Sequence, residues 1–164
     1  MQANPMFEVF NQPDYDLSCE RRDSSTVTPQ VFTLMNSQNS VDRSIAMALR
    51  LQKEYETIEE QVERAFYLTF GRAASGAERK KMAAHVQKMI SYHSQHSPEV
   101  ISPIKELDRT VIEEMSGIAL HYKEILDTED YIPHTKPWDV GPRTRALADL
   151  CLALFNSNEF IYVY

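Results

Sequence analysis

Two capping boxes separated by a glycine restrict the fold of this sequence more than any other feature. Thr57 is followed three residues later by Glu60, and Ser75 is followed in the same way by Glu78. In such a pair, the hydroxyl and the carboxylate each accept a hydrogen bond from the other residue's backbone amide, and this arrangement starts a helix. Gly71 can adopt the left-handed conformation that commonly ends one. The pattern predicts one helix from Thr57 to Gly71 and another that starts at Ser75.

Apolar residues at three- and four-residue steps support a helix in both segments. The first helix carries on one face Ile58, Val62, Ala65, Phe66 and Thr69; the second carries Met82, Val86, Met89, Ile90 and His93. We expect the second helix to fray over residues 94–97.

Helices are also predicted before and after this pair. Thr28 and Pro29 form a helix-start signal, which predicts a helix over 29–36. A further helix is expected from Asn39 or Ser40, with one face formed by Val41, Ile45, Ala48, Leu49 and Gln52. Residues 127–142 are rich in proline and should form a long loop held by Trp138. The last helix follows this loop, with an apolar stripe of Leu147, Leu150, Cys151, Leu154 and Phe155.

Residues 104–126 show helical spacing as well, and we predict a fifth helix there. Its apolar positions are Ile104, Leu107, Val111, Ile112, Met115, Ile118, Ala119, Tyr122, Ile125 and Leu126. Gly117 lies inside this segment and is less favourable in a helix than alanine by about 1 kcal/mol, so a bend is expected there.

The two ends of the chain carry strand-like segments, "FEVF" at 7–10 and "FIYVY" at 160–164. We therefore expect an all-α fold, an irregular bundle of about five to six helices, with a short two-stranded ribbon where the termini meet. The expected organisation is one domain over 1–164. It comprises an irregular entry arm at 1–27, a helical region at 28–126, the Pro-rich loop at 127–142, and the final helix and C-terminal strand at 143–164.

The net charge and the hydropathy of the chain argue against two classes of partner, nucleic acids and the membrane interior. The chain has 164 residues, 43% of them hydrophobic, and a formal net charge of −7. The net negative charge argues against a nucleic acid as partner, because binding to phosphates needs a concentrated basic surface. No apolar run reaches the roughly 20 residues that cross a bilayer, so no membrane insertion is expected. The N-terminus also lacks the regions of a signal peptide.

The segment "SCERRDSSTVTPQ" at 18–30 is the densest collection of reactive side chains. Ser18, Cys19, Ser24 and Ser25 are potential nucleophiles. None of them lies in a glycine-rich elbow or next to a histidine, so we predict no catalytic residue.

Opposite charges stand side by side at Glu20, Arg21, Arg22 and Asp23. The expected role is an arginine fork that binds a carboxylate, or the carbonyl groups at the C-terminus of another helix. An arginine that binds an oxyanion ligand is the alternative. We expect this brace, together with Cys19, to hold the N-terminal loop against the helix that starts near Pro29 and against the turn from Asn156 to Phe160. The polar residues of that turn are Asn156, Ser157, Asn158 and Glu159.

Histidines and charged helix positions are further candidate sites. His85, His93 and His96 lie close in sequence, but no carboxylate or thiolate lies at ligand spacing, so we expect a surface histidine cluster with no metal and no cofactor. We interpret the charged residues Glu59, Glu60, Glu63 and Arg64 as a solvated face of their helix.

Three separated segments resemble a known domain family: "NPMFEVFNQPD", "SCERRDSSTVTPQVFTLMNSQ" and "RALADLCLALFNSNEFIYVY". They are similar to the planctomycete-type C-terminal domain of unknown function, which is found at the end of large proteins that also carry cytochrome-c-like domains. A fourth segment, "AFYLTFGRAASGAER", resembles that family's Gly-Arg segment, which a tyrosine precedes and a capped helix follows.

The resemblance implies a context rather than a chemistry. It implies that this chain is the C-terminal part of a larger exported protein, located in the periplasm or at the cell surface, and it identifies no catalytic residue. An oxidising compartment permits a disulfide, so the resemblance makes a bridge between Cys19 and Cys151 possible.

Two hypotheses about function follow. The first is a non-enzymatic accessory or interaction module that contacts upstream domains of its parent protein or another protein chain, with binding of an acidic or carbohydrate ligand as a variant. The second is a component of a redox or hydrolytic enzyme whose haem or nucleophile lies in an upstream domain. The second hypothesis predicts a concave polar pocket that contains Arg21 and Arg22, with His121 or His134.

Overall fold

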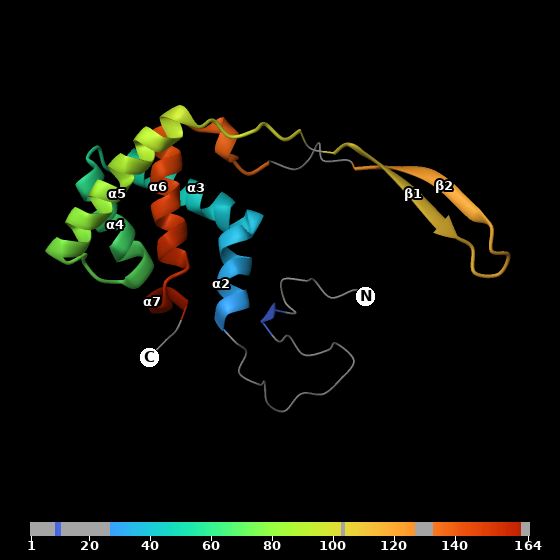
Figure 1. The fold of residues 1–164 in the computed structure, drawn as a ribbon, viewed down its shortest axis with the longest axis horizontal. Helices are drawn as coiled ribbons and strands as arrows, with labels where there is room; N and C mark the ends of the chain where they lie inside the picture. Colours follow the sequence, from blue (N-terminus) through green and yellow to red (C-terminus); the bar gives the residue numbers. More distant parts are fainter. Residues whose placement is uncertain (1–8, 11–26, 103, 127–132, 162–164) are drawn as a thin grey trace, which may run out of the picture. The chain divides into compact units, whose positions relative to one another are not determined.

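The computed structural model describes residues 9–10, 27–102, 104–126 and 133–161. The chain divides into two compact units (Figure 1): one combines Met1–Ser97 with Thr135–Tyr164, and the other is Pro98–His134. The first unit contains the helices α2 (Val27–Asn36), α3 (Gln38–Glu54), α4 (Ile58–Phe70), α5 (Gly76–Gln95), α6 (Pro142–Phe155) and α7 (Asn158–Ile161), with a 3-10 turn at Pro137–Asp139. The second unit contains the strands β1 (Glu106–Ile112) and β2 (Ala119–Ile125). The fold is mostly helical, as predicted.

Both predicted capping boxes are confirmed. The Thr57 hydroxyl accepts a hydrogen bond from the Glu60 amide at 3.3 Å, and the Glu60 carboxylate accepts one from the Thr57 amide at 3.3 Å. Ser75 and Glu78 repeat the arrangement at the start of α5. Gly71 ends α4 with φ of 70°, the left-handed conformation that side chains disfavour.

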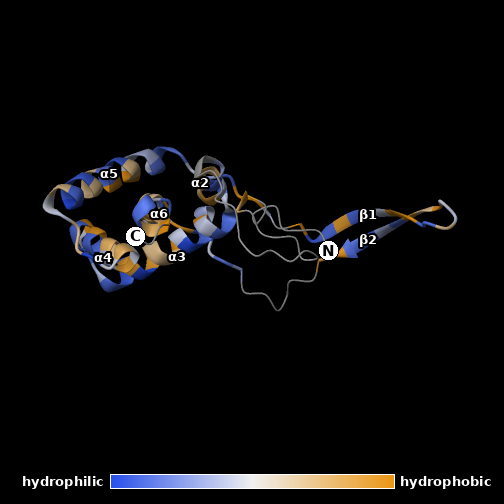
Figure 2. Cartoon of the chain, turned by 90° about the horizontal axis from the view of Figure 1, so that it is seen from below, coloured by the Kyte–Doolittle hydropathy of each residue, from blue (hydrophilic) through white to orange (hydrophobic). Residues whose placement is uncertain are grey.

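Helix α6 lies at the centre of the helical unit, because it packs against α3 and α5 and also contacts α4. In Figure 2 the hydrophobic faces of these helices turn towards one another. Leu147, Leu150 and Cys151 of α6 are fully buried, and they meet Ile45 and Val86 in one core. Full burial of a side chain such as leucine stabilises a fold by about 1.5–3 kcal/mol, so α6 contributes a large share of this core.

The predicted helix over 104–126 is wrong. This segment is an antiparallel hairpin in which Glu106 pairs with Ile125 and Ile112 pairs with Ala119. Gly117 has φ of 70° and closes the turn, with the Gly117 amide donating to the Glu113 carbonyl at 2.8 Å. The segment is rich in β-branched residues, which favour strands, and a glycine that adopts positive φ favours a turn. The apolar spacing that suggested a helix fits an alternating strand pattern equally well over a few residues.

The predicted ribbon between the chain termini is also incorrect for the part that the structure describes. Val9 is helical, and Asn158–Ile161 forms α7 rather than a strand. The other residues of the two segments, 7–8 and 162–164, lie outside the described part of the chain. The ribbon that the sequence led us to expect exists at another place, within residues 106–125.

The described part of the loop before α6 is fixed to α3 by a buried ion pair. Lys136 donates from Nζ to both carboxylate oxygens of Asp42, at 2.8 and 3.1 Å, and the Asp42 side chain is only 4% exposed. Gln38 donates to the same carboxylate at 2.7 Å. Trp138, the residue expected to hold this loop, is half-buried in the 3-10 turn. These contacts therefore fix the position of the loop, relative to α3, just before α6 begins.

Candidate functional site

The residues predicted to brace the fold fall into two groups. Cys19, Glu20, Arg21, Arg22 and Asp23 lie outside the described residues, so their brace remains a prediction. Their expected partners are visible: Asn156 ends α6, while Asn158 and Glu159 begin α7. The Asn156 backbone has φ of −97°, so it ends the helix without the left-handed conformation that asparagine often shares with glycine.

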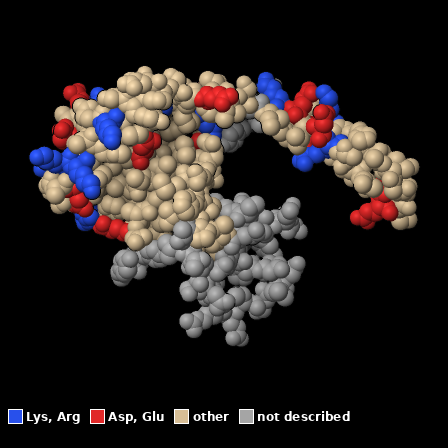
Figure 3. All heavy atoms as spheres, viewed as in Figure 1, with Lys and Arg blue, Asp and Glu red and all other residues tan. Residues whose placement is uncertain are grey.

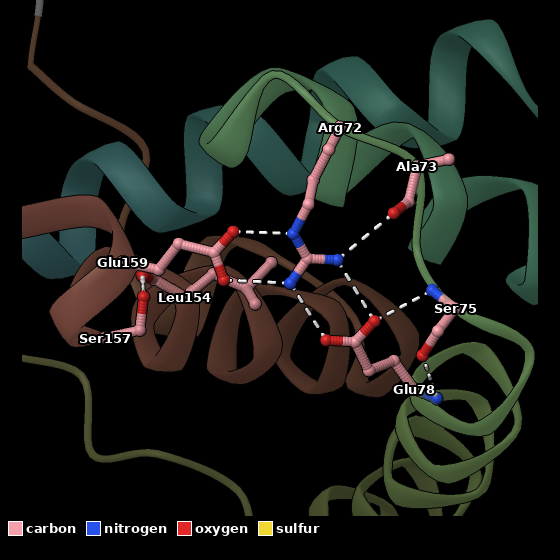
Figure 4. Close-up of polar contacts among 7 residues, drawn as sticks. All are labelled: Arg72, Ala73, Ser75, Glu78, Leu154, Ser157 and Glu159. Carbon is pink, nitrogen blue, oxygen red and sulfur yellow. Dashed lines mark hydrogen bonds and ion pairs between the residues drawn. The ribbon is translucent and has the colours of Figure 1, made fainter. Parts of the chain in front are cut away.

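An arginine fork does bind Glu159, but the arginine is Arg72. Figure 4 shows the Arg72 guanidinium between two carboxylates, one from α5 and one from α7. It donates to Glu159 from Nε at 2.6 Å and from Nη2 at 2.8 Å. It donates to Glu78 from Nη1 at 3.1 Å and from Nη2 at 2.9 Å. Both pairs are bidentate, the geometry that gives an arginine–carboxylate contact its specificity.

The fifth donor of Arg72 is also used, because Nη1 donates to the Ala73 carbonyl at 3.1 Å. A guanidinium has five N–H groups, and all of them are engaged within the chain. Its carbon atom also lies 5.5 Å from the ring centres of both Phe66 and Phe70. Arg72 therefore has no donor left for an external anion, and the arrangement joins the end of α4 to the starts of α5 and α7.

The electrostatics follow from these contacts. Hydrogen bonds from Arg72, followed by those from Ser75, lower the pKa of Glu78 to about 2 from its ordinary value of 4.5. The hydrogen bond from Arg72 also lowers the pKa of Glu159. The two carboxylates in turn raise the pKa of Arg72, with Glu159 the larger influence. All three groups stay charged at neutral pH, so the cluster has a net charge of −1.

A second polar contact joins α5 to α6 and overturns part of the histidine prediction. His93 is not in a surface cluster: its side chain is 16% exposed, and its Nε2 lies 2.6 Å from Oδ2 of Asp149. His96, by contrast, is exposed and stacks on Tyr92 with ring centres 4.2 Å apart. His85 is exposed as well. No group of three or more potential metal ligands converges within the part of the chain that the structure describes.

Arg145 binds the C-terminal end of α5. This buried arginine donates to the His93 carbonyl at 3.0 Å and to the His96 carbonyl at 3.5 Å. The final carbonyl groups of a helix lack partners within the helix and carry partial negative charge, so a guanidinium there satisfies both needs. Binding of helix carbonyls is one of the two roles expected for Arg21 or Arg22, and Arg145 performs it in the described structure.

The residues interpreted as a solvated face of α4 are exposed or partly exposed, and they line a shallow groove. The groove has a volume of about 340 Å³ and is lined by Tyr55, Glu59, Glu60, Glu63, Arg64, Tyr67 and Arg79. Several of its charged groups bind one another or neighbours: Arg79 lies 3.9 Å from Glu63, and Arg64 lies 3.7 Å from Glu54. Glu60 is held in its capping box. The charged groups of the groove are thus partly paired within the chain, although Glu63 Oε2 and Arg64 Nε are buried without a hydrogen-bond partner.

Cys151 lies in the core, and burial raises the pKa of its thiol to about 12. A thiol with so high a pKa is a poor nucleophile at neutral pH, because the thiolate is the reactive form. Cys19 lies outside the described residues, so its disulfide with Cys151 stays a prediction.

Among the residues that the structure describes, the hairpin presents the largest group of exposed apolar side chains. Leu120 is 56% exposed, Tyr122 is 51% exposed, and Met115 at the turn is 96% exposed. Its charged residues pair along the strands, with Arg109 Nε 2.7 Å from Glu124 and Lys123 Nζ 2.9 Å from Glu106. In Figure 3 the half of the hairpin nearer the turn is mostly uncharged, apart from acidic side chains at the turn itself. His121 lies on β2, where its Nδ1 is 2.9 Å from the Thr110 hydroxyl.

Taken together, the described residues define a mostly helical protein whose polar clusters join helices, and in which a two-stranded hairpin carries a large group of exposed apolar side chains. The chain belongs to the family described as "Protein of unknown function (DUF1553)", whose sequence profile matches residues 1–86, just over half of its length. No curated protein and no solved structure matches the chain. The matched region includes Arg72 and Glu78, and in the described structure it ends within α5. No helix among the described residues is long and apolar enough to cross a membrane.

Proposed function

We propose that this protein is a non-enzymatic interaction module, in which the helical unit is a scaffold and the hairpin is the surface that contacts another protein chain. One observation carries the proposal: the apolar side chains of β1, β2 and their turn are exposed, apart from the half-buried Leu107. A two-stranded hairpin alone is marginally stable in water, and three or more strands or a packed neighbour are needed for independent stability. A partner that covers the hairpin would supply what the hairpin lacks.

The polar clusters of the helical unit support the same proposal. Arg72 and Arg145 use their donors to join helices, and His93 is paired with Asp149. These contacts are of the kind that hold a scaffold rigid. The family resemblance suggests where such a scaffold works: as the C-terminal part of a larger exported protein with cytochrome-c-like modules, in the periplasm or at the cell surface. Upstream domains of that parent are then natural neighbours of this module.

The enzyme-component hypothesis depends on different residues. It places Arg21 and Arg22 in a polar pocket, and both lie outside the described residues. It remains the alternative proposal, and binding of an acidic or carbohydrate ligand by the same arginines remains a variant of the first.

The test compares the full chain with a hairpin variant. Leu120→Asp places a charge on the exposed apolar surface, and Tyr92→Ser is the matched control, because Tyr92 is an exposed aromatic residue of the helical unit. Each tagged chain is immobilised at equal density and incubated with an extract of the cells that produce the protein, and bound proteins are quantified by mass spectrometry. We expect a bound protein whose amount falls several-fold for Leu120→Asp and is unchanged for Tyr92→Ser. Equal recovery by all three chains would overturn the proposal.

A further inference from the structure

We infer that the hairpin pairs edge to edge with the hairpin of a second copy of this chain, β2 against β2, to form a four-stranded antiparallel sheet. This inference rests on the proposed function and names its partner. The two-fold axis of the sheet passes next to Tyr122, the middle residue of β2. A sheet of four strands would have the three or more strands that independent stability requires, whereas a lone hairpin has two.

The hydrogen bonds of the hairpin define which backbone groups are available. The Leu126 amide donates to the Lys105 carbonyl, and the Glu113 amide donates to the Ile118 carbonyl. In an antiparallel pair, hydrogen-bonded and non-hydrogen-bonded residue pairs alternate. In this register, every second residue has backbone N–H and C=O groups that point away from the other strand. On β2 these residues are Ala119, His121, Lys123 and Ile125, and on β1 they are Glu106, Asp108, Thr110 and Ile112. Both edges therefore carry a row of groups that can bind a further strand.

Backbone hydrogen bonds, rather than buried area, favour edge pairing over face-to-face stacking. A seven-residue strand is about 24 Å long and two strands are about 10 Å wide, so stacking one hairpin on another would bury only about 250 Å² on each copy. A stable interface needs about 800 Å² per partner. Edge pairing instead adds about eight backbone hydrogen bonds. Its small contact area predicts a weak, concentration-dependent dimer.

The middle residue of each strand decides which edge is used. When a strand pairs antiparallel with its own copy over its full length, its middle residue lies opposite itself. For β1 that residue is Arg109, so two like charges would be opposed. For β2 it is Tyr122, and an aromatic pair across strands is favourable.

The remaining pairs of the β2 register are acceptable. His121 lies opposite Lys123 of the second copy, and Ala119 lies opposite Ile125. Residues of the same formal charge are not opposed at neutral pH. The outer β1 edges carry Glu106 and Asp108 at outward positions, and acidic edges discourage further strands. The assembly therefore stops at two copies.

The first experiment measures the mass of the full chain by sedimentation over a concentration series. His121→Pro removes an outward amide from the β2 edge, and Thr110→Pro removes the equivalent amide from the β1 edge. Both variants lose the contact between the Thr110 hydroxyl and His121, and neither removes a hydrogen bond within the hairpin backbone. We expect the unmodified chain to dimerise reversibly. His121→Pro should weaken the dimer about tenfold or more, while Thr110→Pro should change it little.

A second measurement does not depend on proline. Amide hydrogen exchange is followed by NMR at a low and a high concentration of the unmodified chain. Exchange at His121 and Lys123 should slow as the dimer forms, and exchange at Asp108 and Thr110 should stay the same. A chain that is monomeric at every concentration, or protection that appears on β1 instead of β2, would overturn the inference.

The two proposals can fail separately. If the chain stays monomeric but Leu120→Asp abolishes capture of another protein, the second copy is the wrong partner while the hairpin remains the interaction surface. If neither association depends on the hairpin, both proposals are wrong.

Discussion

Arg72 and Glu159 are 87 residues apart in the sequence, and in the structure they form a bidentate ion pair with contacts of 2.6 and 2.8 Å. The same guanidinium binds Glu78 at the start of α5. Because α7 is a helix of only four residues, this ion pair is a large part of what fixes it. Changes at Arg72 should therefore be felt mainly at α7 and at the start of α5.

Arg72→Ala should lower the midpoint of thermal unfolding by several degrees, because two carboxylates lose their common partner. Hydrogen exchange should speed up over residues 158–161. Arg79→Ala is the matched control, since Arg79 lies 3.9 Å from its carboxylate and makes a weaker contact. Equal melting of Arg72→Ala and the unmodified chain would show that the cluster contributes nothing to stability.

The cluster also predicts a dependence of stability on pH. The pKa of Glu78 is lowered to about 2 in the folded chain from an ordinary 4.5, so the folded state binds its proton less tightly than the unfolded state does. The stabilisation is therefore complete above about pH 4.5 and is lost as the pH falls towards 2. Urea unfolding measured across this range should show a declining free energy of unfolding. The decline should be shallower in Glu78→Gln, and an unchanged slope in that variant would contradict the assignment.

The contact between His93 and Asp149 predicts that substitutions at His93 and at His85, both on α5, differ in their effect on stability. Asp149→Asn or His93→Gln should each lower the free energy of unfolding by about 1 kcal/mol at neutral pH, because a short hydrogen bond between α5 and α6 is weakened. His85→Gln, at an exposed position of the same helix, should have almost no effect. Chemical denaturation of the three variants decides the matter. A loss at His85 as large as that at His93 would argue against the pair.

The position of α6 in the core predicts a large difference between two leucine substitutions. Leu150→Ala removes a buried side chain and should destabilise the protein by about 2–5 kcal/mol. Leu120→Ala, on the exposed hairpin, should change stability by less than about 0.5 kcal/mol in the monomer. Urea titrations at low protein concentration measure both. Similar losses in the two variants would mean that the hairpin is covered within the chain.

Burial of Cys151 predicts that its thiol is protected. In a Cys19→Ser background, a thiol reagent at pH 8 should fail to label the folded protein, because the pKa of the Cys151 thiol is raised to about 12 and the side chain is buried. One equivalent should react once the protein is unfolded in urea. Rapid labelling of the folded protein would show that α6 opens easily.

Local signals predicted local structure well. The capping boxes at Thr57 and Ser75, and the glycine at position 71, depend on residues close in sequence, and the structure confirms all three. The hairpin was missed because its apolar residues fit both helical and strand spacing, and only the pairing of Arg109 with Tyr122 and its neighbours decides between them. The partner of Glu159 could not be predicted either. An ion pair across 87 residues leaves no local pattern, even though an arginine fork was expected in general terms.

The order of the helices along the chain has a consequence for biosynthesis. The helices α3, α4 and α5 share a core with α6, but residues 96–141 are synthesised before α6 begins. At roughly 5–20 residues per second, the ribosome needs about 2–9 s to add that stretch. During this interval Ile45, Val62 and Val86 lack α6, which completes the core that they share. Folding of the helical unit is therefore delayed relative to its own synthesis, and the nascent chain offers a chaperone an apolar surface that the finished protein conceals.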